Sequence, residues 1–164
     1  MEKRFFPVFL DISEKQILVV GGGVIATRRI HTLLQFSSNI AVLAPSISKE
    51  LELLVKSKDI TWIQDVYAIN YVYDKDMVIA ATDDIEVNHQ VYRDCKAIEN
   101  ESNTKILTSV VDDKDLCDYY FPSIVKNEKV VIGINSGGVS PKETKQIRKQ
   151  IEALLDSDSI YEGN

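Results

Sequence analysis

The sequence predicts an α/β fold, in which a parallel β-sheet with helices on both faces is followed by a smaller C-terminal extension. Two observations lead to this prediction. Apolar runs alternate with segments of helical periodicity through the first two thirds of the chain, as expected of repeated strand–helix–strand units. From Cys117 onward the pattern changes to two short apolar runs joined by a polar turn, which is typical of a hairpin.

Five strands and three helices are expected to alternate in the sheet region. The strands are short runs rich in Val and Ile, at Gln16–Val20, Ile40–Leu43, Ile60–Ile63, Met77–Ala80 and Lys105–Val110. The helices have apolar residues three and four positions apart, at Val24–Phe36, Ile47–Lys56 and Ile85–Ile98. Asp83 and Asp84 precede the last helix, and either can cap it. Before all of these, Phe5–Ile12 alternates like a short additional strand.

The C-terminal extension is expected to be a hairpin followed by a helix. Tyr119–Val125 and Lys129–Ile134 are the expected strands, joined by a polar turn. The helix is expected over Glu143–Leu155, with Ser140-Pro141 as a possible start. We therefore divide the chain into a domain of residues 1–115 and an extension of residues 116–164.

Length, composition and charge restrict the class of protein. The chain has 164 residues, of which 45% are hydrophobic and 27% charged, and this length supports a core without metal or disulfide bonds. The net charge of −6 argues against nucleic-acid binding, because phosphate binding needs clustered Lys and Arg. Cys95 and Cys117 have the spacing of neither a redox pair nor a zinc site, so we expect reduced, structural thiols.

Membrane and metal partners are not expected. No apolar run approaches the length of a bilayer span, and the first residues lack the apolar core of a secretion signal. These features predict a cytoplasmic protein without a membrane partner. His31 and His89 are the only histidines, and each falls in a different predicted helix. We therefore expect no metal site.

A glycine turn between the first strand and the first helix indicates a dinucleotide site. Gly21 permits the tight turn, Gly23 lets backbone N–H groups approach a pyrophosphate, and Ala26 is small enough for close packing of helix and strand. The helix N-terminus adds unpaired donors and partial positive charge. Strand, turn and helix in this order predict a Rossmann-like sheet that binds NAD(P).

Other cofactor contacts are expected where neighbouring strands end, because open parallel sheets bind ligands at the carboxyl ends of their strands. No acid or Arg follows the second strand, so these residues leave NAD and NADP both open, and Ser46 or Ser48 could contact the ribose. After the fourth strand, Thr82 and Asp83 could contact cofactor or simply cap the next helix. The expected cofactor-binding residues are Gly21, Gly22, Gly23, Val24, Ile25, Ala44, Pro45, Thr82 and Asp83.

Asp112 is the candidate catalytic residue. It follows the fifth strand, where a carboxylate can face the cofactor crevice. Transfer of a hydride leaves a proton behind, and a carboxylate at the crevice can accept that proton as a general base. The alternative is a loop aspartate that only caps a turn.

Taken together, these residues resemble the precorrin-2 dehydrogenase family, the module that begins siroheme synthases and also occurs alone. The resemblance rests on blocks that occur in the same order along most of the chain. The blocks are Phe6-Pro7-Val8-Phe9-Leu10, Val20-Gly21-Gly22-Gly23 with Ala26, Ala80-Ala81-Thr82-Asp83-Asp84 with Asn88, Val110-Val111-Asp112, Phe121-Pro122-Ser123, and Ser136-Gly137-Gly138 with Ser140-Pro141.

The resemblance implies oxidation of precorrin-2 to sirohydrochlorin in siroheme or cobalamin synthesis, with NAD as hydride acceptor and Asp112 as general base. It also implies a tetrapyrrole site that includes Ser136. We expect Gly137, Gly138 and Asn88 to contribute to that site. The segment Ser136-Gly137-Gly138 offers backbone donors suited to a substrate carboxylate, although an ordinary turn is an equal interpretation.

The resemblance further implies a homodimer in which Tyr119–Ile134 crosses to the partner, and a C-terminal helical region of which only the first helix is expected here. Two alternatives stay open. The enzyme could also insert iron, or the chain could be a non-catalytic accessory module that binds NAD(H) or a tetrapyrrole for a heme-pathway enzyme.

Overall fold

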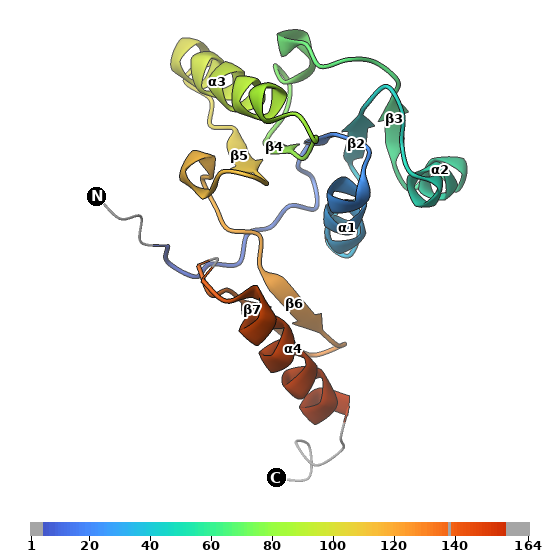
Figure 1. Ribbon diagram of the computed structural model, residues 1–164, viewed down its shortest axis with the longest axis vertical. Coiled ribbons are helices and arrows are strands. Elements are labelled where there is room, and N and C mark those ends of the chain that lie inside the picture. Colours follow the sequence, from blue (N-terminus) through green and yellow to red (C-terminus); the bar gives the residue numbers. More distant parts are fainter. Residues whose placement is uncertain (1–4, 138, 157–164) are drawn as a thin grey trace. The chain divides into compact units, whose positions relative to one another are not determined.

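The computed structural model describes residues 5–137 and 139–156. The chain forms two compact units, residues 1–119 and 120–164 (Figure 1). The boundary expected after residue 115 lies shortly before the observed one. Each unit is described by itself below.

Unit 1 contains a five-stranded parallel sheet, which confirms the predicted fold class. The strands are β1 (Ile17–Val20), β2 (Ile40–Leu43), β3 (Thr61–Ile63), β4 (Met77–Ala80) and β5 (Leu107–Val110). Their order in the sheet is β3-β2-β1-β4-β5. The chain therefore runs outward from β1 to β3 and returns to β4 on the other side of β1. Such a reversal opens a crevice at the carboxyl ends of β1 and β4, where open α/β sheets bind ligands.

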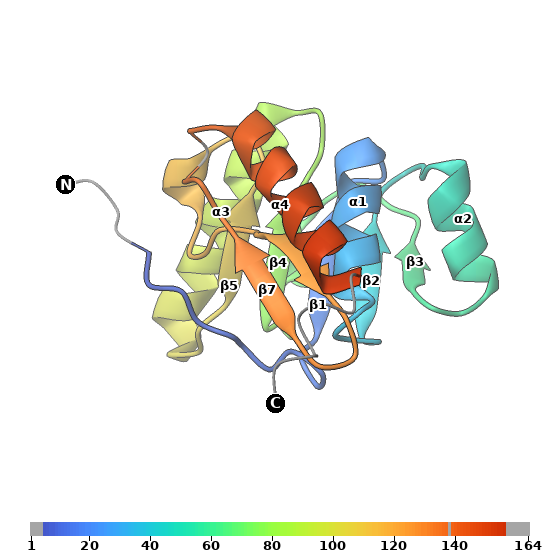
Figure 2. The ribbon, with the colours of Figure 1, turned by 90° about the horizontal axis from the view of Figure 1, so that it is seen from below.

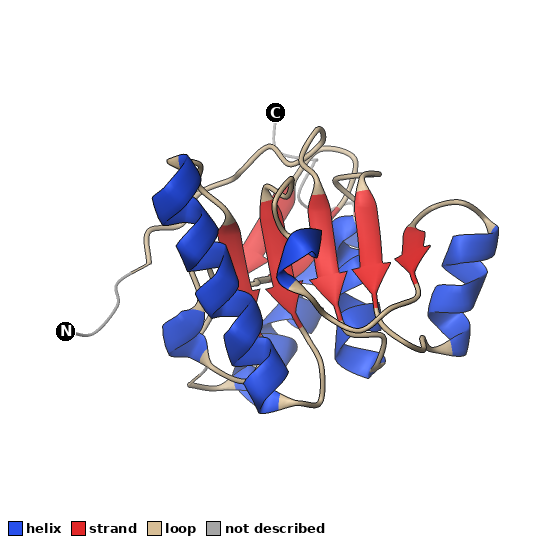
Figure 3. Cartoon of the chain, turned by 90° about the horizontal axis from the view of Figure 1, so that it is seen from above, coloured by secondary structure: helices blue, strands red, loops and turns tan. Residues whose placement is uncertain are grey.

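Helices cover both faces of this sheet (Figure 3). They are α1 (Val24–Leu33), α2 (Lys49–Lys56) and α3 (Ile85–Ser102), with short 3-10 turns η1 (Ile69–Tyr71) and η2 (Lys114–Leu116). Because both faces are covered, every side chain of β1 and β4 is buried. On one face, the core joins alternate strand residues to the apolar side of α3 at Val91, Cys95 and Ile98.

The helix boundaries differ from the prediction where a local cap decides them. Helix α1 ends at Leu33 rather than Phe36, because residues 34–37 form a turn whose N–H groups bond back to the carbonyls of Ile30, Thr32 and Leu33. Helix α3 continues past Ile98 to Ser102 and ends where Asn103 adopts the left-handed conformation, at φ +54°.

The additional strand expected over Phe5–Ile12 is wrong. In the described part of the chain this segment pairs with no other strand. Phe6, Val8 and Phe9 are at least three-quarters exposed. Alternation alone does not make a strand, because a strand needs a partner for its N–H and C=O groups.

Unit 2 contains the predicted hairpin and helix. Strands β6 (Ser123–Lys126) and β7 (Val131–Ile134) pair antiparallel, and α4 (Pro141–Asp156) lies along them (Figure 2). The Asn127 side chain accepts hydrogen bonds from the N–H groups of Lys129 and Val130, which closes the turn. Strand β6 begins later than the expected Tyr119, because its first paired residue is Ser123.

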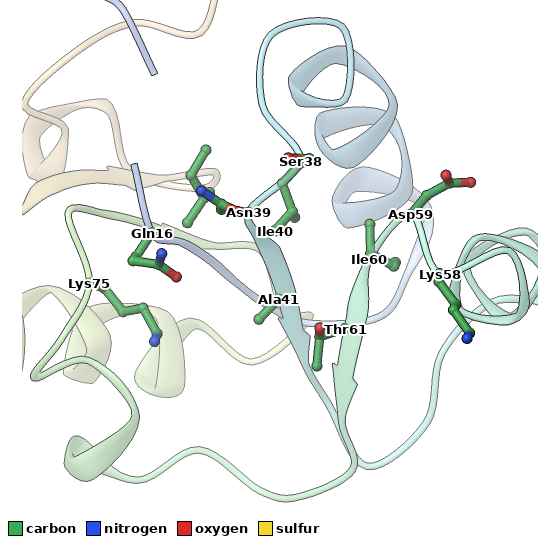
Figure 4. Close-up of a pocket in the computed structure, with 11 residues that line it drawn as sticks. Gln16, Ser38, Asn39, Ile40, Ala41, Lys58, Asp59, Ile60, Thr61 and Lys75 are labelled. Atoms are coloured by element: carbon green, nitrogen blue, oxygen red, sulfur yellow. The ribbon is translucent and has the colours of Figure 1, made fainter. Parts of the chain in front are cut away.

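A cavity of about 200 Å³ lies at the amino ends of the strands of unit 1 (Figure 4). Gln16, Asn39 and Thr61 line it together with Lys58 and Lys75. It is at the opposite edge of the sheet from the glycine turn, so it is not part of the crevice. Within residues 5–137 and 139–156, no helix is long and apolar enough to cross a membrane.

Candidate functional site

The turn after β1 is held by close backbone contacts. Gly21 has φ +117°, a conformation that L side chains rarely adopt, and a Cβ placed on it would lie 2.3 Å from the carbonyl oxygen of Ala81. The Gly21 N–H also donates to the carbonyl of Leu43 at 2.9 Å. This residue therefore brings the ends of β1, β2 and β4 together.

The next two glycines differ in the space around them. A Cβ on Gly22 would lie 2.2 Å from the carbonyl oxygen of Ser46, whereas a Cβ on Gly23 would meet no protein atom within 4 Å. Gly23 is the N-cap residue of α1. No side chain caps this helix, and its first turn contains no acidic residue. The open space and the uncapped N–H groups fit a dinucleotide pyrophosphate.

Backbone and side-chain hydrogen bonds hold the loop after β2 between the glycine turn and β3. The Ser48 N–H donates to the Gly22 carbonyl at 2.9 Å, and the Ser48 hydroxyl lies 2.9 Å from the Thr27 hydroxyl while it caps α2. The Ala44 and Pro45 carbonyls accept from Trp62 Nε1 at 2.9 Å and from Gln64 Nε2 at 3.3 Å. Ala44 is buried and Pro45 is exposed, so Pro45 presents the surface that a cofactor could contact.

The loop after β4 assigns different tasks to its two aspartates. Asp84 caps α3, because its Oδ1 accepts from the N–H groups of Glu86 and Val87 at 2.9 and 3.2 Å. Asp83 is exposed and therefore remains available to a ligand. Thr82 turns inward: its N–H and hydroxyl lie 3.0 and 2.8 Å from Asn88 Oδ1.

Asp112 stands in the next loop along the sheet edge, directly after β5. Its side chain is exposed, but one oxygen, Oδ2, accepts a hydrogen bond of 2.8 Å from Asn88 Nδ2. Asn88 is wholly buried, at 0% exposure. The structure therefore brings the candidate base together with a residue that we had expected to bind substrate.

Asp113 differs from its neighbour Asp112 in every contact. Its Oδ1 accepts from the Asp115 N–H at 2.9 Å and so caps η2, while Oδ2 lies 3.6 Å from His89 Nε2. Asp113 thus has the capping role that was the alternative for Asp112. Among the described residues, no three His, Cys, Asp or Glu side chains form a group that could hold a metal ion.

Asp118, which follows η2, links α3 to β5, the two elements that position Asn88 and Asp112. Lys96 Nζ lies 2.7 Å from Asp118 Oδ2, which also accepts from the Thr108 N–H at 2.9 Å. Burial by itself raises the pKa of Asp118, but these hydrogen bonds outweigh it and hold the pKa below its ordinary value. The ionised Asp118 carboxylate therefore stabilises the folded unit.

The expected tetrapyrrole residues Ser136 and Gly137 lie in unit 2, at the end of β7. The Ser136 hydroxyl accepts from the Thr144 hydroxyl at 3.0 Å and from the Ser140 N–H at 3.3 Å, which fixes the start of α4. The Gly137 N–H donates to Asn135 Oδ1 at 2.9 Å. Gly138 lies outside the described residues.

Sequence reasoning missed two residues that shape the crevice. Trp62, the only tryptophan, holds the Ala44 carbonyl from β3, and a lone aromatic in a strand carries no signal for that contact. Asn88 was singled out for a different role. A buried polar residue on the apolar side of a helix signals a buried hydrogen-bond network, but the sequence does not name its partners.

A family model described as putative NAD(P)-binding matches residues 8–123. The chain belongs to this family. The matched region contains the glycine turn, the loops after β2 and β4, and Asp112, so the residues that fit a dinucleotide lie inside it.

Curated relatives and a solved structure are similar over almost the whole chain. A siroheme synthase of Psychrobacter sp. (strain PRwf-1) is 39% identical over 150 residues, and one of Mannheimia succiniciproducens is 36% identical over 152 residues. The chain spans about a third of the length of these relatives, at 30% and 31%. The structure of SirC, a precorrin-2 dehydrogenase, matches with a TM-score of 0.76 and 27% identity over 93% of this chain and 72% of that chain.

Proposed function

We propose that this chain is an NAD-dependent dehydrogenase that oxidises precorrin-2 to sirohydrochlorin in siroheme biosynthesis, with Asp112 as the general base. The observation that carries the proposal is an exposed carboxylate fastened by a buried amide at the same sheet edge as an open glycine turn. The similarity to siroheme synthases and to the precorrin-2 dehydrogenase SirC supports the choice of substrate.

The reaction removes two hydrogens from the tetrapyrrole, one as a hydride and one as a proton. Bound NAD supplies the hydride acceptor. The uncapped N-terminus of α1 at Gly23 binds the pyrophosphate. Pro45 and Asp83 lie on either side of the crevice. Asp112 Oδ1 takes the proton, because Oδ2 is occupied by the Asn88 amide.

We propose NAD rather than NADP as the cofactor. The segment from Ala44 to Ser48 carries no basic side chain, and the first turn of α2 carries Glu50 and Glu52. A 2′-phosphate would meet no Arg there, and the single Lys49 at the start of α2 stands beside two carboxylates. A free ribose hydroxyl can hydrogen-bond the polar Ser46. Cytoplasmic location remains a prediction from the sequence.

We propose that unit 2 forms a homodimer and, through Ser136, Gly137 and Gly138, contributes to the tetrapyrrole site. Of the residues of β6 and β7 only Val125 is buried, and Ile147 and Leu154 of α4 are 42% and 56% exposed, so unit 2 leaves apolar side chains that a second copy could cover. Sedimentation equilibrium tests the dimer. A mass twice 18.5 kDa is expected, and a monomer at all concentrations would contradict it.

The test of the function is anaerobic absorbance of precorrin-2 mixed with the protein and NAD, repeated with NADP and with Asp112→Ala. The spectrum of sirohydrochlorin should appear with NAD, more slowly with NADP, and at least about 100-fold more slowly with the variant than with wild type. Tetrapyrrole binding without conversion, in a protein that binds NAD, would favour the accessory module instead. Addition of ferrous iron to the product then tests iron insertion separately.

A further inference from the structure

The side chain of Asn88 makes four contacts with two loops. Its Oδ1 lies 3.0 Å from the Thr82 nitrogen and 2.8 Å from the Thr82 hydroxyl, and its Nδ2 lies 3.1 Å from the Thr82 carbonyl and 2.8 Å from Asp112 Oδ2. The residue is 0% exposed. All of its strong hydrogen-bonding positions are therefore used within unit 1.

The chemistry of the partners determines which way the amide points. The Thr82 carbonyl and the Asp112 carboxylate can only accept, so the amide nitrogen must face both of them. The Thr82 N–H can only donate, so the amide oxygen must face it. An Asn is thus matched to this position in a way that neither Asp nor Leu can reproduce.

We infer that Asn88 is a positioning residue for Asp112, an inference that rests on the proposed function. Asp112 follows β5 in an exposed loop, and the buried amide is its only hydrogen-bond partner in the described part of the chain. The bond holds Oδ2 and leaves Oδ1 as the atom that receives the substrate proton. A general base has to be held at hydrogen-bonding distance from that proton, and displacement by about 1 Å costs about 100-fold in rate.

Asn88 also connects the base to the cofactor turn. Thr82 lies beside Gly21, whose Cβ, if present, would be 2.9 Å from the Thr82 nitrogen. Contacts therefore run without a gap from Gly21 to Thr82, from Thr82 to Asn88, and from Asn88 to Asp112. Asn88 sets the distance between the cofactor turn and the carboxylate, so its loss should lower kcat more than it weakens NAD binding.

Steady-state kinetics of Asn88→Ala, Asn88→Asp, Asp112→Ala and the double variant Asn88→Ala/Asp112→Ala test this inference. Asn88→Ala should lower kcat by about 10- to 100-fold and leave KM for NAD within about threefold. In the Asp112→Ala background it should cost nothing further, because it acts through Asp112. Asn88→Asp keeps the shape but replaces the donor by an acceptor beside Asp112, and it should also lower kcat.

Cys95→Ala is the matched control. Cys95 is buried on the same side of α3, two turns beyond Asn88, where it is part of the apolar core. It should leave kcat within about twofold. The inference is overturned if Cys95→Ala lowers kcat as much as Asn88→Ala, or if Asn88→Ala lowers the residual rate of the Asp112→Ala protein further.

A spectroscopic experiment tests the contact without turnover. In ¹⁵N–¹H spectra of the ligand-free protein, Asp112→Ala should move the side-chain amide signals of Asn88 and leave those of Asn39 in place. Unmoved Asn88 signals would overturn the inference even if the enzyme is active. A wild-type protein that does not oxidise precorrin-2 would instead overturn the proposed function, while the spectra still decide whether Asp112 is held.

Discussion

The turn after β1 and the loops after β4 and β5 lie at the same edge of one sheet, but they are built in different ways. The contacts that define the turn at Gly21 and Gly22 are with backbone atoms of neighbouring strands and loops. The loops are held by side chains, above all by Asn88 between Thr82 and Asp112. Backbone contacts of this kind suit the binding of a pyrophosphate, which all dinucleotides share, whereas side-chain contacts can position one reacting group.

The largest effect is expected in the loop after β5, which side-chain contacts hold in place. Asp112→Asn keeps the shape of the side chain but removes the base, so turnover of precorrin-2 should fall by about 10²- to 10⁴-fold, while the dissociation constant of NAD stays within about threefold. Stopped-flow absorbance and calorimetric titration with NAD measure the two quantities.

Asp113→Asn is the control for that experiment, because the adjacent carboxylate caps η2 and lies near His89. It should keep turnover within about threefold of wild type. Equal losses in the two variants would remove the distinction between a reacting carboxylate and a capping one.

Two substitutions test the turn after β1, and each replaces a glycine by alanine. Gly21→Ala forces a side chain into a left-handed residue and against the Ala81 carbonyl, so the free energy of unfolding should fall by at least about 2 kcal/mol. Gly23→Ala meets no protein atom and should cost less than about 1 kcal/mol, yet weaken NAD binding at least about tenfold by filling the pyrophosphate space.

Urea unfolding and calorimetric titration with NAD separate these effects. A Gly23→Ala protein that binds NAD as wild type does would show that the open space beside this residue is not the cofactor site. A Gly21→Ala protein of full stability would show that the turn tolerates a side chain after all.

The smallest effect is a pH dependence of stability carried by Asp118. Its pKa lies below the ordinary 3.8 in the folded protein, so its contribution is complete above that value and is lost as the pH falls through the lowered pKa. As the pH falls below about 4, wild type should therefore lose stability more steeply than Asp118→Asn, which lacks this carboxylate.

Urea unfolding across that pH range measures the difference. Asp83→Asn, which removes an exposed carboxylate, controls for the change in net charge. Parallel curves for wild type and Asp118→Asn would show that the ionised Asp118 carboxylate does not stabilise the folded unit.

Local sequence patterns predicted the fold well where packing on both faces agrees with them. Strands β2 and β4 begin and end where expected, because each is a short apolar run that follows a polar residue, Asn39 or Asp76, and packs within a sheet covered on both faces. The prediction over Phe5–Ile12 was wrong, because an alternating pattern does not reveal whether a partner strand exists. Likewise, Asp83 and Asp84 were equal as caps until the backbone oriented Asp84 toward the N–H groups of α3.

The sequence by itself determined the order of strands and helices, the glycine turn and the position of an acid after β5, because each depends on residues that are adjacent along the chain. Only the tertiary structure decided that Asn88 holds Asp112 across 24 positions and that Trp62 holds the loop at Ala44. The first pair depends on how β4, β5 and α3 pack, and the second on the pairing of β2 with β3. A polar side chain takes whichever partner such packing brings within hydrogen-bonding distance.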